Sequence, residues 1–100
     1  MTMQTMKRAI KGSDHDIAVS TSSARTTVKF TEPEIGIYCA TACYVKFGDD
    51  TVTVSTSDYD VYVPAGQRYD LRNGGAGYAA VILASGTDTA YINEWTDKQV

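Results

Sequence analysis

Residues 35–47 read IGIYCATACYVKF, and this stretch decides the fold class. Its odd positions carry isoleucine, cysteine, threonine, valine and phenylalanine, whereas its even positions carry glycine, alanine, tyrosine and lysine. A period of two is typical of a β-strand, whose successive side chains point to opposite faces, and it does not fit a helix. We therefore predict one long strand whose odd face enters the core. A bend or bulge is expected near residues 40–42, because strands rarely exceed about 10 residues.

Further short runs of β-branched and aromatic residues alternate with turn signals along the rest of the chain. The additional strands are predicted over residues 16–19, 26–30, 51–55, 60–63, 68–72, 78–84 and 89–95. The turns between them are predicted at Glu32-Pro33, Gly48-Asp49-Asp50, Pro64-Ala65-Gly66, Asn73 to Gly77 and Ser85 to Asp88. Residues 79–83 are apolar on both faces, which favours a central strand covered on both sides; a short helix is the alternative.

The composition agrees with an all-β fold. Thr, Val, Ile and Tyr supply 35 residues, against five Leu and Met, and the former types suit a pleated, half-buried surface. No predicted strand is followed by a helical pattern, so a parallel α/β sheet is not expected. We predict an antiparallel β-sandwich, jelly-roll-like, over residues 15–100 as a single domain. Residues 1–14 are polar without a sustained period, and they are expected to form an extended, flexible N-terminal arm.

Charge and hydropathy exclude several classes of function. The net charge is −3, and Lys7, Arg8 and Lys11 form the one local basic cluster, so nucleic acid is not an expected partner. No apolar run approaches the roughly 20 residues of a membrane helix, and the first ten residues lack the apolar stretch of a secretory signal. We expect a protein made in the cytoplasm, without a membrane partner.

The titratable residues do not form a catalytic or metal-binding pattern. His15 is the only histidine, and we expect it exposed in a polar turn, without a nucleophile elbow elsewhere in the sequence. The acidic residues Asp49, Asp50, Asp58 and Asp60 could hold calcium, but their spacing does not match an EF-hand loop. We predict no enzyme activity, no metal and no cofactor.

Two other features have ordinary structural readings. Residues 74–77, Gly-Gly-Ala-Gly, lack the Lys-Ser/Thr of a nucleotide-binding loop and are read as a turn. Cys39 and Cys43 would lie about 13 Å apart in one intact strand, too far for a disulfide. No second Cys or His pair completes a zinc site, so both are expected to be buried free thiols.

The aromatic residues suggest binding surfaces. Tyrosine and tryptophan are enriched at protein interfaces, and they can equally stack on sugars. Tyr38 and Tyr44 lie on the even face of residues 35–47, so we expect both to be exposed. The predicted interface residues are Tyr38, Tyr44, Lys46, Met6, Lys7, Arg8 and Trp95.

About half of the chain resembles a known class of protein. The segments YVKFGDDTVTVSTSDYDVYVPAG (residues 44–66) and YAAVILASGTDTAYINEW (residues 78–95) resemble small β-rich proteins encoded among tailed-phage and prophage structural genes. The resemblance implies a virion component, such as a capsid decoration (cement) protein or a head-tail or tail accessory. It implies capsid or other virion proteins as partners, a homo-oligomer, and residence in the virion after synthesis in the host cytoplasm.

Two other functions remain as alternatives. The tyrosines and acidic turns are compatible with a carbohydrate- or receptor-binding β-module. A minimal cupin-type enzyme would use strands around Pro64-Ala65-Gly66, but such metal sites need two or three histidines, and this chain has one.

Overall fold

The computed structural model describes residues 5–9 and 14–99, and the side chains of residues 14–95. Over these residues the chain forms β-strands and no helix, which confirms the all-β class. The strands are β1 (Thr5–Ala9), β2 (Ile17–Val19), β3 (Ala24–Arg25), β4 (Glu34–Cys39), β5 (Cys43–Gly48), β6 (Val61–Val63), β7 (Gln67–Arg72), β8 (Tyr78–Leu83) and β9 (Asp88–Gln99). Within the described part of the chain, no helix has the length and hydropathy to cross a membrane.

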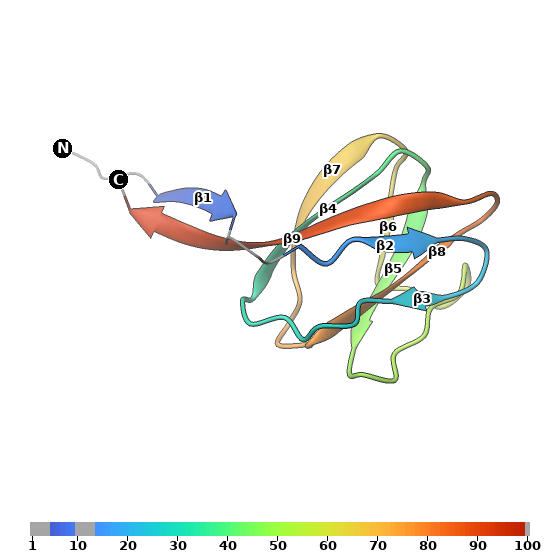
Figure 1. The fold of residues 1–100 in the computed structure, drawn as a ribbon, viewed down its shortest axis with the longest axis horizontal. Coiled ribbons are helices and arrows are strands. Elements are labelled where there is room, and N and C mark those ends of the chain that lie inside the picture. The colour runs from blue at the N-terminus through green and yellow to red at the C-terminus, as the bar shows by residue number, and fades with distance from the viewer. Residues whose placement is uncertain (1–4, 10–13, 100) are drawn as a thin grey trace.

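The strands form two antiparallel sheets (Figure 1). The first has the order β1-β9-β4-β7, with β2 also paired to β9, and the second has the order β3-β8-β5-β6. The pairs β2–β9, β3–β8, β4–β7 and β5–β6 are nested within one another along the chain. The body is therefore one long hairpin, with its turn between β5 and β6, and successive pairs of strands fall in alternate sheets.

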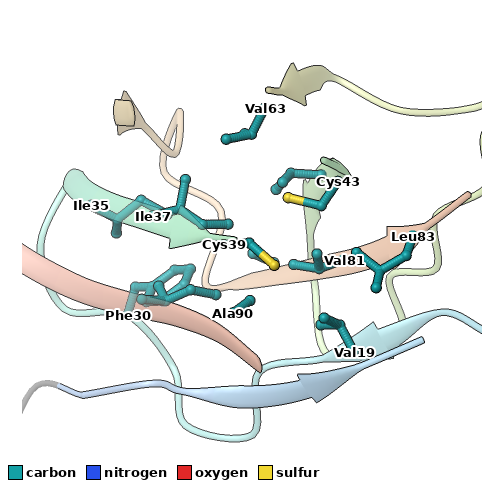
Figure 2. Close-up of a cluster of buried hydrophobic side chains, with 13 residues drawn as sticks. Val19, Phe30, Ile35, Ile37, Cys39, Cys43, Val63, Val81, Leu83 and Ala90 are labelled. Carbon is teal, nitrogen blue, oxygen red and sulfur yellow. The ribbon is translucent and has the colours of Figure 1, made fainter. Parts of the chain in front are cut away.

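A single main hydrophobic cluster lies between the two sheets. Figure 2 shows Ile35, Ile37 and Cys39 of β4 directed into this interior, with Val81 and Leu83 of β8 coming from the other sheet. These five side chains are at most 1 % exposed. Burial of each large aliphatic side chain contributes roughly 1.5–3 kcal/mol, so this interior is the main source of stability.

The alternation predicted for residues 35–47 is confirmed, but the single long strand is wrong. Ile35, Ile37, Cys39, Cys43 and Val45 are all fully buried, on the odd positions. The chain leaves the first sheet at the end of β4 and enters the second sheet at the start of β5. The bend expected at residues 40–42 is thus sharp enough to divide the stretch into two strands. The crossing keeps the odd side chains pointing into the same interior.

The central position predicted for residues 79–83 is also confirmed. Strand β8 lies between β3 and β5, and its side chains from Ala79 to Leu83 are at most 9 % exposed. One face meets the main cluster, and on the other face Ala80 and Ile82 pack against Val54 and Val52. A strand covered on both sides needs apolar residues on both, so the helix alternative is excluded.

Residues 51–55 are not the predicted strand, and Gly48-Asp49-Asp50 does not close a hairpin. The Asp49 carboxylate accepts hydrogen bonds from the Thr51 amide (2.9 Å) and hydroxyl (2.6 Å), and the Val52 amide donates to the Asp49 carbonyl. Such local bonds compete with a strand ladder. The segment instead forms a loop that covers the outer face of β8, which explains its alternating valines.

Residues 26–30 are likewise not a strand. The amide of Thr26 donates to Ala79 and that of Phe30 to Gly77, so the segment is attached at both ends. Between these points it leaves the sheet, and Val28 is 63 % exposed. The paired residues are the two before it, Ala24–Arg25 of β3. The strands predicted over 16–19, 60–63, 68–72, 78–84 and 89–95 are confirmed within one residue at each end, except that β9 continues to Gln99.

A two-stranded ribbon extends from one end of the body (Figure 1). It consists of β1 and the last part of β9, paired from Ala9 with Trp95 to Thr5 with Gln99. The pairing of β9 with β4 ends at Trp95, so among the described residues only β1 accompanies β9 beyond that point. Part of the predicted N-terminal arm is thus a strand. Residues 1–4 and 10–13 lie outside the described residues, and the flexibility of the arm stays a prediction.

Candidate protein-binding surfaces

The outer face of the first sheet carries an exposed tyrosine pair. Tyr38 of β4 and Tyr91 of β9 occupy directly opposite positions, with ring centroids 6.4 Å apart. Tyr38 is 38 % and Tyr91 is 50 % exposed. The exposure predicted for Tyr38 is confirmed, because an even position of β4 points away from the interior.

Beside this pair, three strands build a cation–π stack. The Arg68 guanidinium of β7 lies 4.3 Å from the ring centroid of Trp95 on β9. Gly36 of β4 lies between them and is buried, and a Cβ there would come within 2.7 Å of the Arg68 guanidinium and collide with the Trp95 indole. Glycine is therefore required for the stack to form. Trp95, a predicted interface residue, is half-buried under Arg68.

The outer face of the second sheet carries a cluster of three tyrosines. Tyr44 of β5 lies opposite Tyr62 of β6, with ring centroids 5.2 Å apart, and Tyr59 packs edge-on against Tyr44 at 4.8 Å. Tyr59 is 42 % and Tyr62 is 44 % exposed. Tyr44, predicted to be exposed, is half-buried because the other two tyrosines and the β8-covering loop pack on it.

The aspartate side chains in the turns next to this cluster accept hydrogen bonds from neighbouring residues. Lys46 Nζ contacts both oxygens of the Asp58 carboxylate at 2.8 and 2.9 Å, and Asp60 accepts a hydrogen bond from the Phe47 amide at 2.9 Å. The Thr51 hydroxyl and amide lower the pKa of Asp49. Across the described part of the chain, no three His, Cys, Asp or Glu side chains gather as metal ligands would.

His15 is buried, which corrects its predicted exposure. Its amide donates to the Ile92 carbonyl, its ring meets Phe30 edge-on at 4.8 Å, and its side chain is 3 % exposed. The Nε2 atom lies 2.9 Å from Glu94 Oε2, while the Thr31 amide (2.5 Å) and the Glu32 amide (2.8 Å) donate to Oε1 of the same carboxylate. These bonds tie His15 and residues 31–32 to β9 at the base of the ribbon, a structural role.

The two cysteines are buried free thiols, as predicted, but they do not lie in one strand as the prediction assumed. They lie in strands of different sheets, since the chain turns between them, and they are close enough for each thiol to shift the pKa of the other. Burial, together with the neighbouring Cys39, raises the pKa of Cys43 to about 12. Burial likewise raises the pKa of Cys39. Thiols of this kind are unreactive at neutral pH.

The glycine-rich turn borders an open hollow in the surface. Gly74 and Gly75 have φ of 65° and 87°, values that glycine adopts without strain, and the turn is anchored by the Asn73 side chain. An open hollow of about 610 Å³ separates it from Asp49 and Asp50. The lining is backbone and mixed charge, with no convergent set of catalytic groups among its residues.

The predicted interface residues fall on three separate surfaces. Tyr38 and Trp95 lie on the outer face of the first sheet, and Tyr44 and Lys46 on that of the second. Met6, Lys7 and Arg8 lie in β1 of the ribbon; their side chains are outside the described part of the structure. Sequence reasoning missed Tyr59, Tyr62, Tyr91 and Arg68. The last three lie on outward positions of strands, which the period of two would have identified once each strand was aligned.

Comparison with known proteins adds no relative. The chain matches no protein-family model, no curated protein and no solved structure.

Proposed function

We propose that this chain is a non-enzymatic structural protein of a tailed-phage or prophage virion, and that it decorates the capsid surface as a homo-oligomer. The virion part of the proposal is supported by the resemblance of residues 44–66 and 78–95 to small phage structural proteins. The assembly part is supported by the surfaces described above. A head-tail or tail accessory role is the close variant of the same proposal.

The ribbon is the observation that carries the assembly role. A two-stranded hairpin alone in water is marginally stable, because each strand has only one neighbour and little apolar surface is buried. The longest dimension of the molecule is 49 Å, against 27 and 23 Å in the other two directions, and the ribbon lies along it. A contact with a neighbouring subunit or with the capsid would stabilise this segment, as expected for an arm that orders on assembly.

The nested strand pairs support a jelly-roll course for the body. In a jelly roll, a long hairpin is rolled so that consecutive strand pairs alternate between two facing sheets, and this is the arrangement of β2 to β9. Jelly rolls occur in viral capsid proteins, lectins and cupins, so the fold is compatible with a virion role. We propose this fold with residues 1–14 as its extended arm.

Mass spectrometry of particles purified from the producing cells tests the virion role. The proposal predicts peptides of this chain at a copy number comparable to that of the major capsid protein. Particles that lack the chain would exclude a decoration role. Particles that carry only a few copies would favour the head-tail or tail variant.

A proline variant tests the ribbon. The Ile92 carbonyl of β9 accepts a hydrogen bond from the His15 amide, so the backbone groups of the even-numbered β9 residues point toward β2 and β1. Thr96 is one of these residues and lies opposite Arg8, so Arg8 pairs with it through backbone hydrogen bonds. Arg8→Pro removes this amide hydrogen, whereas Arg8→Ala keeps it. We expect Arg8→Pro to weaken binding to chain-free particles more than Arg8→Ala does, with an unchanged body. Equal particle binding by Arg8→Pro and the unmodified protein would contradict the assembly role of the ribbon.

The tyrosine cluster favours a second candidate, a carbohydrate-binding module. Tyr59 and Tyr62 present exposed rings that can stack on sugar faces, and Asp58 lies next to them as a hydrogen-bonding group. A glycan array with the unmodified protein tests it, with Tyr62→Ala as the site variant and Tyr91→Ala, on the opposite sheet, as the matched control. Binding lost only in Tyr62→Ala supports this function; no binding to any glycan removes it.

A further inference from the structure

The first sheet ends in a regular edge strand, β7. It pairs with β4 in an unbroken register from Gln67 with Cys39 to Arg72 with Glu34, and it contains no proline or glycine. The described edges of the second sheet, β3 and β6, are only two and three residues long. Proteins usually shorten, bend or interrupt a strand edge that must not pair with another chain. In β7, charged side chains are the only such feature that could oppose pairing with another chain.

The hydrogen-bond pattern identifies the residues that face the open edge. The Asn73 amide donates to the Pro33 carbonyl at 2.9 Å, which continues the β4–β7 register by one pair. Because backbone groups alternate in direction along an antiparallel strand, Tyr69 and Leu71 direct theirs toward β4. Arg68 and Asp70 therefore direct their amides and carbonyls away from β4, along the open side of the sheet.

We propose that a second copy of this chain pairs with β7 antiparallel to itself, about a two-fold axis through Tyr69. The proposal deepens the homo-oligomer proposed above by naming its interface, and it rests on that proposal for the existence of an oligomer. The two copies form one continuous sheet in the order β1-β9-β4-β7-β7-β4-β9-β1. Each copy contributes its edge strand, and the pairing is isologous.

Charge complementarity selects this axis. Residues opposite each other in an antiparallel pair lie on the same face, so a two-fold axis must pass through a residue and its own copy. With Tyr69 on the axis, Arg68 of each copy lies opposite Asp70 of the other. Within one chain Arg68 Nε lies 3.6 Å from Asp70 Oδ1 while the guanidinium stacks on Trp95, so this register places an arginine opposite an aspartate and brings no like charges face to face.

The neighbouring registers are less favourable. With Asp70 on the axis, the two Asp70 side chains would face each other and Arg68 would face Arg72, and directly opposed like charges are destabilising. With Leu71 on the axis, Asp70 faces Arg72 but the pairing within the strand is limited to residues 70–72. The Tyr69 axis pairs the whole segment 67–71 and is the register we assign.

The pairing leaves the ribbon available for another contact. Strand β7 is at one end of the first sheet and β1 is at the other. The two ribbons of the dimer therefore lie at opposite ends of the continuous sheet. Self-association through β7 and attachment to a particle through the ribbon use different surfaces, so a failure of one can be told from a failure of the other.

Proline and asparagine at position 70 test the pairing. Asp70→Pro removes an amide hydrogen that points away from β4, so the ladder within the chain is kept and only the pairing between copies is blocked. Asp70→Asn is the matched control for the loss of charge. In sedimentation velocity we expect the unmodified chain to be dimeric or larger and Asp70→Pro to lose that association, with Asp70→Asn intermediate and an unchanged circular dichroism spectrum. An Asp70→Pro variant that associates like the unmodified chain overturns the interface while leaving the oligomer proposal intact.

Disulfide trapping tests the register without relying on that variant. Tyr69→Cys places two thiols across the axis at a Cα separation of about 4.5 Å, within the disulfide range. Leu71→Cys places them about 13 Å apart. Oxidised glutathione, which takes up the two electrons and two protons, should give a covalent dimer with Tyr69→Cys and none with Leu71→Cys. Trapping by Leu71→Cys alone, or by neither variant, overturns the Tyr69 axis. The native thiols are buried and do not compete.

Discussion

His15 Nε2 lies 2.9 Å from Glu94 Oε2, so a residue ahead of the first strand of the body is bonded to the strand that ends the chain. Both side chains are at most 5 % exposed. Their bond, with those from Thr31 and Glu32, closes the end of the body from which the ribbon extends. A buried carboxylate that accepts several hydrogen bonds stabilises the fold only while it is ionised, so its contribution to stability depends on pH.

Acid is expected to weaken the fold through Glu94. Burial alone would raise its pKa, but the hydrogen bonds from His15, Glu32 and Thr31 outweigh burial and hold the pKa below its ordinary value of 4.5. A lowered carboxyl pKa contributes stability above the unfolded pKa, and this contribution is lost as pH falls through the folded pKa. Urea unfolding of the unmodified protein and Glu94→Gln should differ by about 1–3 kcal/mol at neutral pH, and the difference should vanish as the pH falls through the lowered pKa of Glu94. A constant difference at all pH values would contradict this account.

Neighbouring substitutions in β4 test the two faces of the strand. Ile37 is fully buried, so Ile37→Asp places an unpaired charge in the interior and should cost more than about 4 kcal/mol, enough to unfold the domain. Tyr38 is 38 % exposed, so Tyr38→Ser should cost no more than about 1 kcal/mol while weakening assembly. Thermal melts measure both. Equal losses would refute the assigned faces.

Gly36→Ala should disrupt the stack of Arg68 on Trp95. The added methyl group would overlap the Trp95 indole, which has to move, and overpacking of this kind costs roughly 1–3 kcal/mol. We expect the fluorescence of Trp95, the only tryptophan, to shift to longer wavelength as the ring becomes more exposed. In a Trp95→Ala background the same glycine substitution should cost less. A cost that is unchanged in that background would show that the indole is not the obstacle.

We expect neither thiol to react in the folded protein. Burial and the neighbouring Cys39 raise the pKa of Cys43 to about 12, and both side chains are fully buried. A thiol reagent at neutral pH should therefore label neither cysteine in the native state and both after unfolding in urea. Rapid native labelling of either thiol would mean that the turn at residues 40–42 opens readily.

The sequence predicts local features of this protein better than it predicts the path of the chain. The period of two identified the inward residues Ile35, Ile37 and Val45, because burial depends only on which face a side chain occupies. It did not predict the crossing at residues 40–42, because a strand that changes sheets keeps the same inward face. The valines of residues 51–55 also alternate, but Asp49 turns the chain into a covering loop.

The exposure of the surface residues also follows partly from local patterns and partly from contacts between distant segments. An outward tyrosine such as Tyr38 follows from its place in one strand. Tyr44 is half-buried because Tyr59 and Tyr62 come from other segments, and His15 is buried because Glu94, 79 residues away, accepts its hydrogen bond. Contacts between distant segments decide both outcomes, and no local pattern in the sequence encodes them.

The proposed function requires that copies of this chain bind one another. Sedimentation equilibrium of the full chain over a wide concentration range measures this directly, against a chain mass of 10.8 kDa. We predict a reversible association to at least twice that mass, weakened by Asp70→Pro. A protein that stays at 10.8 kDa at every concentration, in the presence and absence of virus particles, would contradict the account.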